Sequence, residues 1–211
     1  MPSGWDNYQV MCKPSFYNQR WNINGKNVTT GSAPADYTTS VMGNASVAWI
    51  KALLANPDHP PFFAAVGPHA PHLPSTPAPW YAGTLGALRA PTTGNYGYHG
   101  VDHHWEISMQ PPIDEGMAAS IDAEFTKRQE SLLSVDDLMK AVHATLAAAG
   151  EWENTYAIFT SDHGYSLGQF RVPTHKTQVM MHVLTRLCPL HLLLTGIRRR
   201  RSTTTWLACP C

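Results

Sequence analysis

The sequence Thr155-Tyr-Ala-Ile-Phe-Thr-Ser-Asp-His-Gly164 holds the pattern that decides the fold. Its first six residues form a short apolar run that is typical of a strand buried on both faces. The polar pair Asp162-His163 follows directly, and Gly164 lets the backbone turn sharply behind it. The stretch therefore predicts a buried strand at residues 155–160 with polar side chains at its carboxyl end.

Each expected strand is preceded by an expected helix. Residues 121–149 have the helical period, and Gly150 suits the first position beyond a helix C-terminus. Earlier in the chain, residues 36–55 have the same period, Asn56-Pro57 ends it, and residues 61–66 follow as another short apolar run. The expected apolar stripes are Tyr37, Val41, Ala45, Ala48, Leu53 and Leu54 in the first helix, and Leu132, Val135, Leu138, Met139, Val142 and Leu146 in the second. This alternation predicts an α/β domain with a largely parallel sheet flanked by helices.

Polar side chains also follow residues 61–66. The segment after this strand reads Gly67-Pro-His-Ala-Pro-His-Leu-Pro74 and contains His72. Because ligands collect at the carboxyl ends of parallel strands, we expect His72 and the polar pair of the second strand at the same edge of the sheet. Residues 68–98 lack a helical period and are rich in Pro, Gly, Ala and Thr, which indicates a long functional loop.

These polar residues have the chemistry of a site for a cation and an anion. The carboxylate of Asp162 and the imidazole of His163 suit a divalent cation, although an aspartate at this place also caps turns. His72 can hydrogen-bond an anionic substrate oxygen or protonate a leaving group. Lys176 can bind an anion as a point charge. Taken singly, both His72 and Lys176 are also ordinary polar surface residues.

The composition excludes several classes of protein. The 211 residues contain no apolar run long enough for a membrane helix, so no membrane span is expected. The formal net charge is zero, but residues 1–162 hold all 15 acidic side chains while residues 163–211 hold none. The four cysteines form no C-x-x-C pair, which argues against a zinc knuckle or a disulfide framework. The N-terminus has neither the basic nor the apolar region of a signal peptide.

Several weaker motifs remain. Asn27-Val-Thr and Asn44-Ala-Ser are N-glycosylation acceptor sequences, which predict sugars on Asn27 and Asn44. The pairs His69/His72 and His103/His104 raise a zinc hypothesis, but no H-E-x-x-H signature accompanies them. The four arginines at 198–201 stand beside an atypical tail, so no nucleic-acid partner is expected.

Longer stretches resemble a known family. The sequences Lys127-Arg-Gln-Glu-Ser-Leu-Leu-Ser-Val-Asp-Asp-Leu138 and Gly150-Glu-Trp-Glu-Asn-Thr-Tyr-Ala-Ile-Phe-Thr-Ser-Asp-His-Gly-Tyr-Ser-Leu-Gly-Gln-Phe170 resemble the sulfatases. The likeness is strongest to the branch of N-acetylglucosamine-6-sulfatases and heparan-sulfate 6-O-endosulfatases, and it covers residues 2–179. Ala70-Pro-His-Leu-Pro74 and His104-Trp105 fall in the order and spacing of that branch.

The resemblance implies an alkaline-phosphatase-like α/β domain that hydrolyses sulfate esters of sugars, such as glucosamine 6-sulfate in glycosaminoglycans. It implies a calcium ion held in part by Asp162 and His163, and a formylglycine nucleophile made from a C/S-x-P-x-R motif. It also implies that His72 contacts the sulfate ester and that Lys176 binds sulfate. The relatives of this branch are lysosomal, cell-surface or secreted proteins, and a sulfated saccharide is the implied partner.

The sequence also departs from the family pattern. The family places its formylglycine motif and its first pair of metal ligands upstream of the matching region, so we expect this chain to be an inactive fragment. Cys12-Lys-Pro-Ser-Phe16 has Phe where the motif has Arg. Residues 180–211 do not match, which predicts a partial catalytic domain over 1–179 and an aberrant, poorly ordered tail over 180–211. The alternatives are a phosphoesterase or phosphodiesterase of the same superfamily with two zinc ions, and a non-catalytic truncated remnant.

Overall fold

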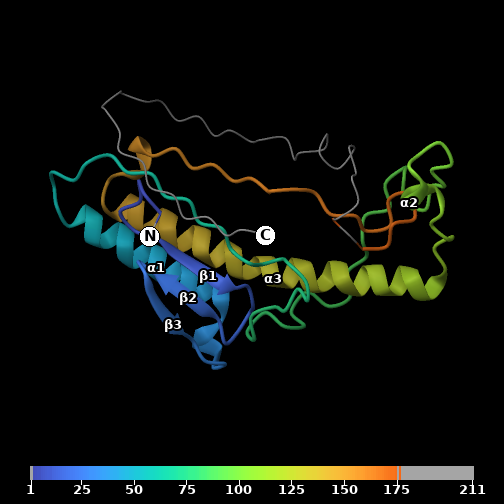
Figure 1. The fold of residues 1–211 in the computed structure, drawn as a ribbon, viewed down its shortest axis with the longest axis horizontal. Helices are drawn as coiled ribbons and strands as arrows, with labels where there is room; N and C mark the ends of the chain where they lie inside the picture. Colours follow the sequence, from blue (N-terminus) through green and yellow to red (C-terminus); the bar gives the residue numbers. More distant parts are fainter. Residues whose placement is uncertain (1, 175, 177–211) are drawn as a thin grey trace. The chain divides into compact units, whose positions relative to one another are not determined.

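The computed structural model describes residues 2–174 and 176, which form a mixed α/β chain (Figure 1). Its elements are β1 (Gln9–Lys13), β2 (Arg20–Ile23), β3 (Lys26–Thr29), η1 (Pro34–Asp36), α1 (Thr38–Leu54), α2 (Trp105–Ser108), α3 (Glu115–Ala148) and η2 (Trp152–Asn154). The described residues divide into two compact units. The first unit contains residues 2–82 and 130–155, and the second contains residues 83–129, 156–174 and 176. The expected tail, 180–211, lies outside the described residues.

The sheet of the first unit is antiparallel, with the order β1-β2-β3. Strands β2 and β3 form a hairpin in which Ile23 pairs with Lys26 across a two-residue turn. The turn residues Asn24 and Gly25 both have positive φ, 50° and 90°, which is the conformation of a type I′ turn. On the neighbouring pair of strands, Met11 lies opposite Trp21, and both side chains are buried. This antiparallel sheet was not predicted from the sequence.

Neither of the two predicted strands is part of a β ladder in the described part of the chain. Residues 61–66 follow α1 in the chain, and residues 155–160 begin immediately after η2. Within the second segment, Ile158 and Phe159 are each 67% exposed. A parallel ladder needs a strand on at least one side to accept its hydrogen bonds, and these segments have no such strand among the described residues. The described residues therefore do not show the largely parallel sheet.

Helix α1 matches the predicted bounds of 36–55 closely, but its most buried face differs from the predicted stripe. Ala48 is exposed, whereas the buried positions within the helix are Thr38, Thr39, Gly43, Ser46 and Ile50. The small residues on this face allow α1 to lie close to the C-terminal half of α3 (Figure 1). A Cβ atom built on Gly43 would lie 3.4 Å from Cγ of Leu138, so the two helices meet at this glycine.

Helix α3 is longer than predicted because its N-terminus is capped earlier. The carboxylate of Asp114 accepts a hydrogen bond from the backbone N–H of Met117 at 2.8 Å, so the helix begins at Glu115. At the other end, Gly150 has a φ of +75°, and Glu151 N donates to the carbonyl of Leu146 at 2.9 Å. This is a Schellman motif, and it confirms Gly150 as the residue that ends the helix. Among the described residues, no helix has the length and apolar character to cross a bilayer.

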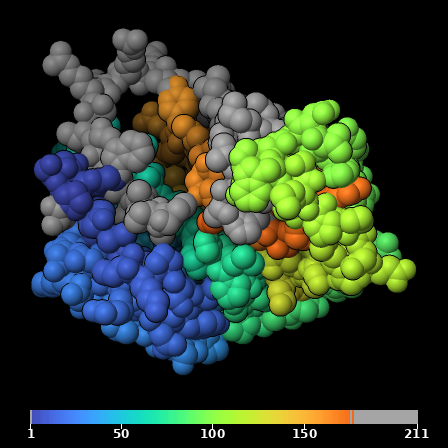
Figure 2. Space-filling view, turned by 45° about the vertical axis from the view of Figure 1, so that its right-hand side comes forward, coloured from blue at the N-terminus to red at the C-terminus, as the bar shows by residue number. Residues whose placement is uncertain are grey.

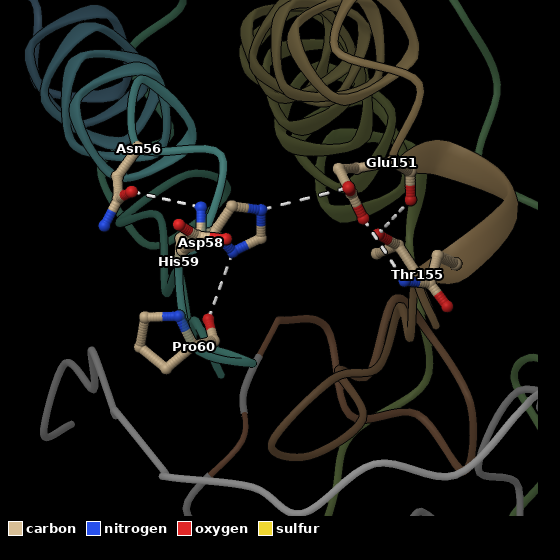
Figure 3. A network of polar contacts seen from close by, with 7 residues as sticks. Asn56, Asp58, His59, Pro60, Glu151 and Thr155 are labelled. Atoms are coloured by element: carbon tan, nitrogen blue, oxygen red, sulfur yellow. Dashed lines mark hydrogen bonds and ion pairs between the residues drawn. The ribbon is translucent and has the colours of Figure 1, made fainter.

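The C-terminal ends of α1 and α3 are linked by a small polar network (Figure 3). Nε2 of His59 lies 3.8 Å from a carboxylate oxygen of Glu151, and its Nδ1 lies 3.1 Å from the carbonyl oxygen of Pro60. The carbonyl of Glu151 accepts a hydrogen bond from the hydroxyl of Thr155 at 2.7 Å. The network therefore fixes the start of the segment that leads to residues 156–160.

Each unit has its own small core. In the first unit, the buried cluster comprises Phe16, Tyr37, Ala70, Ala78 and Val135. Figure 2 shows the N-terminal segment of this unit, in blue, as closely packed side chains. The core of the second unit is smaller, with Ile107 and Val172 buried and Phe170 packed against them. The first core includes Ala70, which lies two residues before His72 in the chain.

Candidate metal and anion-binding residues

Asp162 and His163 lie in a tight turn of the second unit, and their side chains face each other. One carboxylate oxygen of Asp162, Oδ2, lies 3.3 Å from Nε2 of His163. The other oxygen accepts a hydrogen bond from the backbone N–H of His163 at 3.0 Å. The hydroxyl of Ser161 donates to the carbonyl of His163 at 2.7 Å and closes the turn. An anionic oxygen and an imidazole nitrogen are thus presented together at the surface of this unit.

The hydrogen bonds of His163 determine which of its nitrogens is available. Nδ1 lies 2.8 Å from the carbonyl oxygen of Gly164, and a carbonyl can only accept, so Nδ1 carries the proton. In the neutral ring Nε2 holds the lone pair, whereas in the protonated ring Nε2 would be the ion-pair partner of the Asp162 carboxylate. This nitrogen is the one beside the Asp162 carboxylate, so both potential ligand atoms point to the same place. The arrangement fits a divalent cation, although no group of three or more His, Cys, Asp or Glu side chains gathers anywhere in residues 2–174 and 176.

A half-buried arginine supports the segment that follows this pair. The guanidinium of Arg128, from α3, stacks over the ring of Tyr165 at 3.8 Å from the ring centroid. Burial lowers the pKa of Arg128, and burial also raises the pKa of the Tyr165 phenol. Burial therefore favours the neutral phenol, and the lowered pKa of Arg128 reflects a guanidinium that is partly removed from water. The pair anchors the chain two residues beyond His163.

Lys176 is half-buried and comes from the same unit as Asp162 and His163. The segment that leads to it makes a turn in which Gly168 N donates to the carbonyl of Val172 at 2.8 Å. This turn is attached to residues 95–97 by a β-bridge between Tyr96 and Gln169. The predicted approach of Lys176 to the Asp162 carboxylate stays a prediction.

His72 lies in the first unit, at the surface of a double turn. Its backbone N–H donates to the carbonyl of His69 at 2.8 Å, and its own carbonyl accepts from Ser75 N at 2.7 Å. Nδ1 of His72 lies 2.7 Å from the carbonyl oxygen of Leu73, so Nδ1 is the protonated nitrogen and Nε2 is the reactive one. The peptide bonds Ala70–Pro71 and Leu73–Pro74 are both cis. The side chain of His72 is exposed, as a residue that meets a substrate must be.

The structure describes each unit by itself, so it brings together only part of the predicted site. Asp162 and His163 are in contact, while the predicted meeting of His72 with this pair stays a prediction. The motif-like Cys12 is exposed in β1, and Phe16 is buried in the core. The acceptor residues Asn27 and Asn44 are both exposed, and sugars on them also stay a prediction.

Sequence reasoning missed three residues that support the site. In the sequence, Arg128 and Tyr165 stand out only as parts of the stretches that resemble the sulfatases, and His69 only as one member of a possible zinc-binding histidine pair. No periodicity reveals a cation–π contact between residues that are 37 positions apart in sequence. His69 was within reach of prediction, because a histidine three residues before another in a turn-forming segment can stack on it.

Comparison with known proteins identifies relatives over most of the chain. The sequence profile described as Sulfatase matches residues 2–185. N-acetylglucosamine-6-sulfatase from Homo sapiens is 36% identical over 182 residues, which cover 85% of this chain and 32% of the human protein. The extracellular sulfatase SULF-1 homolog from Drosophila melanogaster is 30% identical over 173 residues, covering 81% of this chain and 16% of that protein. The chain thus spans about a third or less of the length of these relatives.

A solved structure shares the fold. It is the structure of BT4656 in complex with its substrate, D-glucosamine-2-N,6-O-disulfate. The TM-score is 0.58 with 14% sequence identity, and the match covers 83% of this chain and 47% of that one. This likeness concerns the fold alone.

Proposed function

The chain belongs to the sulfatase family, and we propose that it carries the cation-binding and anion-binding part of a site that hydrolyses sulfate esters of sugars. The observation that carries this proposal is the facing pair of Asp162 Oδ2 and His163 Nε2, 3.3 Å apart, within the stretch that matches the family. The substrate class is proposed from the names of the relatives, which include an N-acetylglucosamine-6-sulfatase. A sulfated sugar such as glucosamine 6-sulfate is therefore the proposed substrate.

Asp162 and His163 are proposed as calcium ligands. A bound divalent cation would neutralise part of the charge on a sulfate group and polarise its oxygens. The backbone N–H of His163 holds the Asp162 carboxylate, and the Gly164 carbonyl accepts from Nδ1 of His163, so in the neutral ring Nε2 can coordinate beside Asp162 Oδ2. Two ligands alone hold calcium weakly, because affinity rises with the number and charge of the ligands.

His72 and Lys176 are proposed to act on the anion. The Nδ1 proton of His72 is engaged by the carbonyl of Leu73, so Nε2 is the atom left to face the ester. Nε2 accepts a proton when the ring is neutral, and it donates to the bridging ester oxygen of the departing sugar only when the ring carries a second proton. The ammonium of Lys176 is proposed to bind the sulfate oxygens as a point charge. The family's formylglycine nucleophile is expected from the resemblance, and no residue of this chain is assigned to that role.

The parallel sheet is also a proposal. Residues 61–66 and 155–160 are proposed to become neighbouring strands when the other strands of a sulfatase domain lie beside them. Support comes from the second segment, whose exposed apolar side chains have the composition of a strand buried on both faces. In that arrangement His72 and the Asp162-His163 pair would follow strand ends at one sheet edge.

Three further features are proposed on the same basis. Residues 1–179 would be part of the catalytic domain, with 180–211 as a separate tail. Asn27 and Asn44 would carry N-linked sugars, since both are exposed acceptors. A lysosomal, cell-surface or secreted location would accompany such sugars, and the name of the Drosophila relative includes the word extracellular.

A second candidate function is a phosphoesterase or phosphodiesterase with zinc. The specific observation in its favour is the imidazole nitrogen of His163, because zinc accepts nitrogen ligands readily and calcium prefers oxygen. The two candidates therefore differ in the metal that the Asp162-His163 pair selects.

Calorimetric titration of the chain with Ca²⁺ and with Zn²⁺, combined with mass spectrometry of the bound metal, tests the proposal. We expect the wild type to bind calcium weakly, with a dissociation constant of about 1 mM or higher. Asp162→Asn should abolish this binding. Asp102→Asn is the matched control, because Asp102 also precedes a histidine but that histidine packs on Phe170 at 4.7 Å. Equal calcium binding by the wild type and Asp162→Asn would overturn the metal assignment. Stoichiometric zinc that Asp162→Asn releases would favour the second candidate.

A further inference from the structure

His69 is buried next to the exposed His72 in the first unit. Only 9% of His69 is exposed, whereas His72 lies at the surface. The two imidazole rings are nearly parallel, with their centroids 4.9 Å apart and an angle of 20° between their planes. The His69 ring also contacts the ring of Phe16 at 4.7 Å. His69 therefore lies between the core and the residue proposed to meet the substrate.

The inner end of this stack is rigid. Phe16 is 4% exposed and stacks on the ring of Tyr37 at 5.9 Å. Tyr37 is fully buried, and its hydroxyl donates to the carbonyl of Thr76 at 2.9 Å. Because close-packed side chains occupy single rotamers, the face of His69 that meets His72 has a fixed position.

The backbone of His72 is held as well, which leaves only its side-chain torsions to be fixed. Hydrogen bonds to His69 and from Ser75 close the turns on both sides of it. The hydroxyl of Ser75, a fully buried residue, adds a 3.2 Å hydrogen bond to the carbonyl of Pro71. The bond from Nδ1 to the Leu73 carbonyl then sets the rotation of the ring about its axis. The parallel His69 ring supplies the remaining constraint, since it supports one face of the imidazole.

We propose that His69 is a positioning residue for His72, which it holds by ring stacking so that Nε2 of His72 faces the substrate in one orientation. The inference rests on the proposed function, in which Nε2 of His72 contacts the sulfate ester. A side chain that is already ordered loses less conformational entropy on binding, and ordering one such side chain changes an affinity by about two- to tenfold. His69 contributes through its π face, so another flat ring should replace it.

The test is nuclear magnetic resonance of the ¹⁵N-labelled full chain, which reports the tautomer and the ring-proton shifts of His72. Spectra of His72→Ala assign the signals. In the wild type we expect the neutral His72 ring to be protonated on Nδ1. His69→Ala should shift the tautomer populations toward those of free histidine and should move the ring-proton shifts, whereas His69→Phe should keep the wild-type values. His59→Ala is the control for loss of another histidine in the same unit.

Folding is checked by thermal unfolding of each variant. If His69→Ala does not fold, His69→Leu replaces it, because leucine fills the space without offering a flat ring. Unchanged tautomer populations and ring shifts of His72 in the folded Ala or Leu variant would overturn the proposal. The proposal would also be overturned if His69→Phe gave the same His72 tautomer populations and ring shifts as His69→Leu.

A sulfate titration separates this inference from the proposed function. Sodium sulfate is added at constant ionic strength, with sodium chloride as the reference. We expect sulfate to shift the His72 signals in the wild type and to bind about two- to tenfold more weakly to the variant that lacks the flat ring. If sulfate shifts no His72 signal in any variant, the proposed contact with the ester is wrong. The tautomer measurement then still decides whether His69 positions the ring.

Discussion

The backbone of Gly168 lies against the ring of Tyr96 so closely that a Cβ atom on Gly168 would overlap the ring carbons. The contact joins the turn after the Asp162-His163 pair to the loop at residues 95–97. Gly97 N donates to the carbonyl of Gly168 at 2.8 Å, so hydrogen bonding and close packing coincide there. A glycine is required at 168 for space and also for conformation, since its φ is +97°.

Gly168→Ala should therefore lower the free energy of unfolding by more than about 2 kcal/mol, because overlap and backbone strain add. Gly97→Ala is the matched control. Gly97 also has a positive φ, +67°, but no atom lies within 4 Å of its Cβ position, so we expect a loss of about 1 kcal/mol. Urea unfolding measures both values. Equal losses in the two variants would show that the Tyr96 ring moves aside without cost.

Helix α1 and most of α3, including its C-terminal end, could be predicted from local sequence. The stripe from Leu132 to Leu146 has the helical period, and in the structure Val135, Leu138 and Leu146 are buried. Met139, also assigned to the stripe, is 45% exposed. Gly150 could be recognised in the sequence because glycine commonly takes the positive φ that ends a helix. These features depend on neighbours in sequence, which is why periodicity and single residues were enough.

The hairpin of β2 and β3 was predictable but was missed. Asn24-Gly25 is the strongest short signal for a two-residue hairpin turn, and residues on both sides can pair in register. The position of the metal and anion residues relative to one another is a different problem. It depends on strand partners for residues 61–66 and 155–160, and no local pattern specifies those partners.

Gly43→Ala should stabilise the chain. Gly43 lies inside α1, where glycine costs about 1 kcal/mol relative to alanine. The new methyl group would lie 3.4 Å from Cγ of Leu138, an ordinary packing distance. We expect a gain of about 0.5–1 kcal/mol in the free energy of unfolding by urea.

Two controls define the cause of this gain. Gly43→Leu should destabilise the chain by about 1–3 kcal/mol, since the larger side chain cannot fit between α1 and α3. Ala48→Gly, at an exposed position of the same helix, should cost about 1 kcal/mol and calibrates the helix propensity. A stable Gly43→Leu variant would mean that the helices do not meet at this position.

Tyr37 should make the stability of the first unit fall at alkaline pH. Burial raises the pKa of its phenol above the ordinary value of 10.0. A raised pKa means that the folded state favours the protonated form, so the stabilisation is complete below pH 10 and is lost as the pH rises through the raised pKa. Urea unfolding from pH 7 to 11 should show this decline.

Tyr37→Phe should reduce the alkaline decline and should cost about 1 kcal/mol at neutral pH, through loss of the hydrogen bond to Thr76. Phe16→Leu removes part of the same core without removing a phenol. That control should lower stability to a similar extent at every pH. An alkaline decline of unchanged steepness in Tyr37→Phe would assign it to other tyrosines, among which Tyr17 and Tyr165 also have raised pKa values.

The contact between Arg128 and Tyr165 should couple α3 to the proposed metal pair. A guanidinium 3.8 Å from a ring centroid and partly removed from water gives a cation–π energy of about 0.5–2 kcal/mol. Tyr165→Leu removes the ring, whereas Tyr165→Phe keeps it, so the leucine variant should be the less stable of the two. In a double-mutant cycle of Arg128→Met with Tyr165→Leu, we expect a coupling energy of about 1 kcal/mol.

Because Tyr165 is two residues from His163, the leucine variant should also bind calcium more weakly than the phenylalanine variant. A coupling energy of zero would mean that the Arg128–Tyr165 contact does not stabilise the chain. Equal calcium affinity of the leucine and phenylalanine variants would mean that the contact does not affect the metal pair.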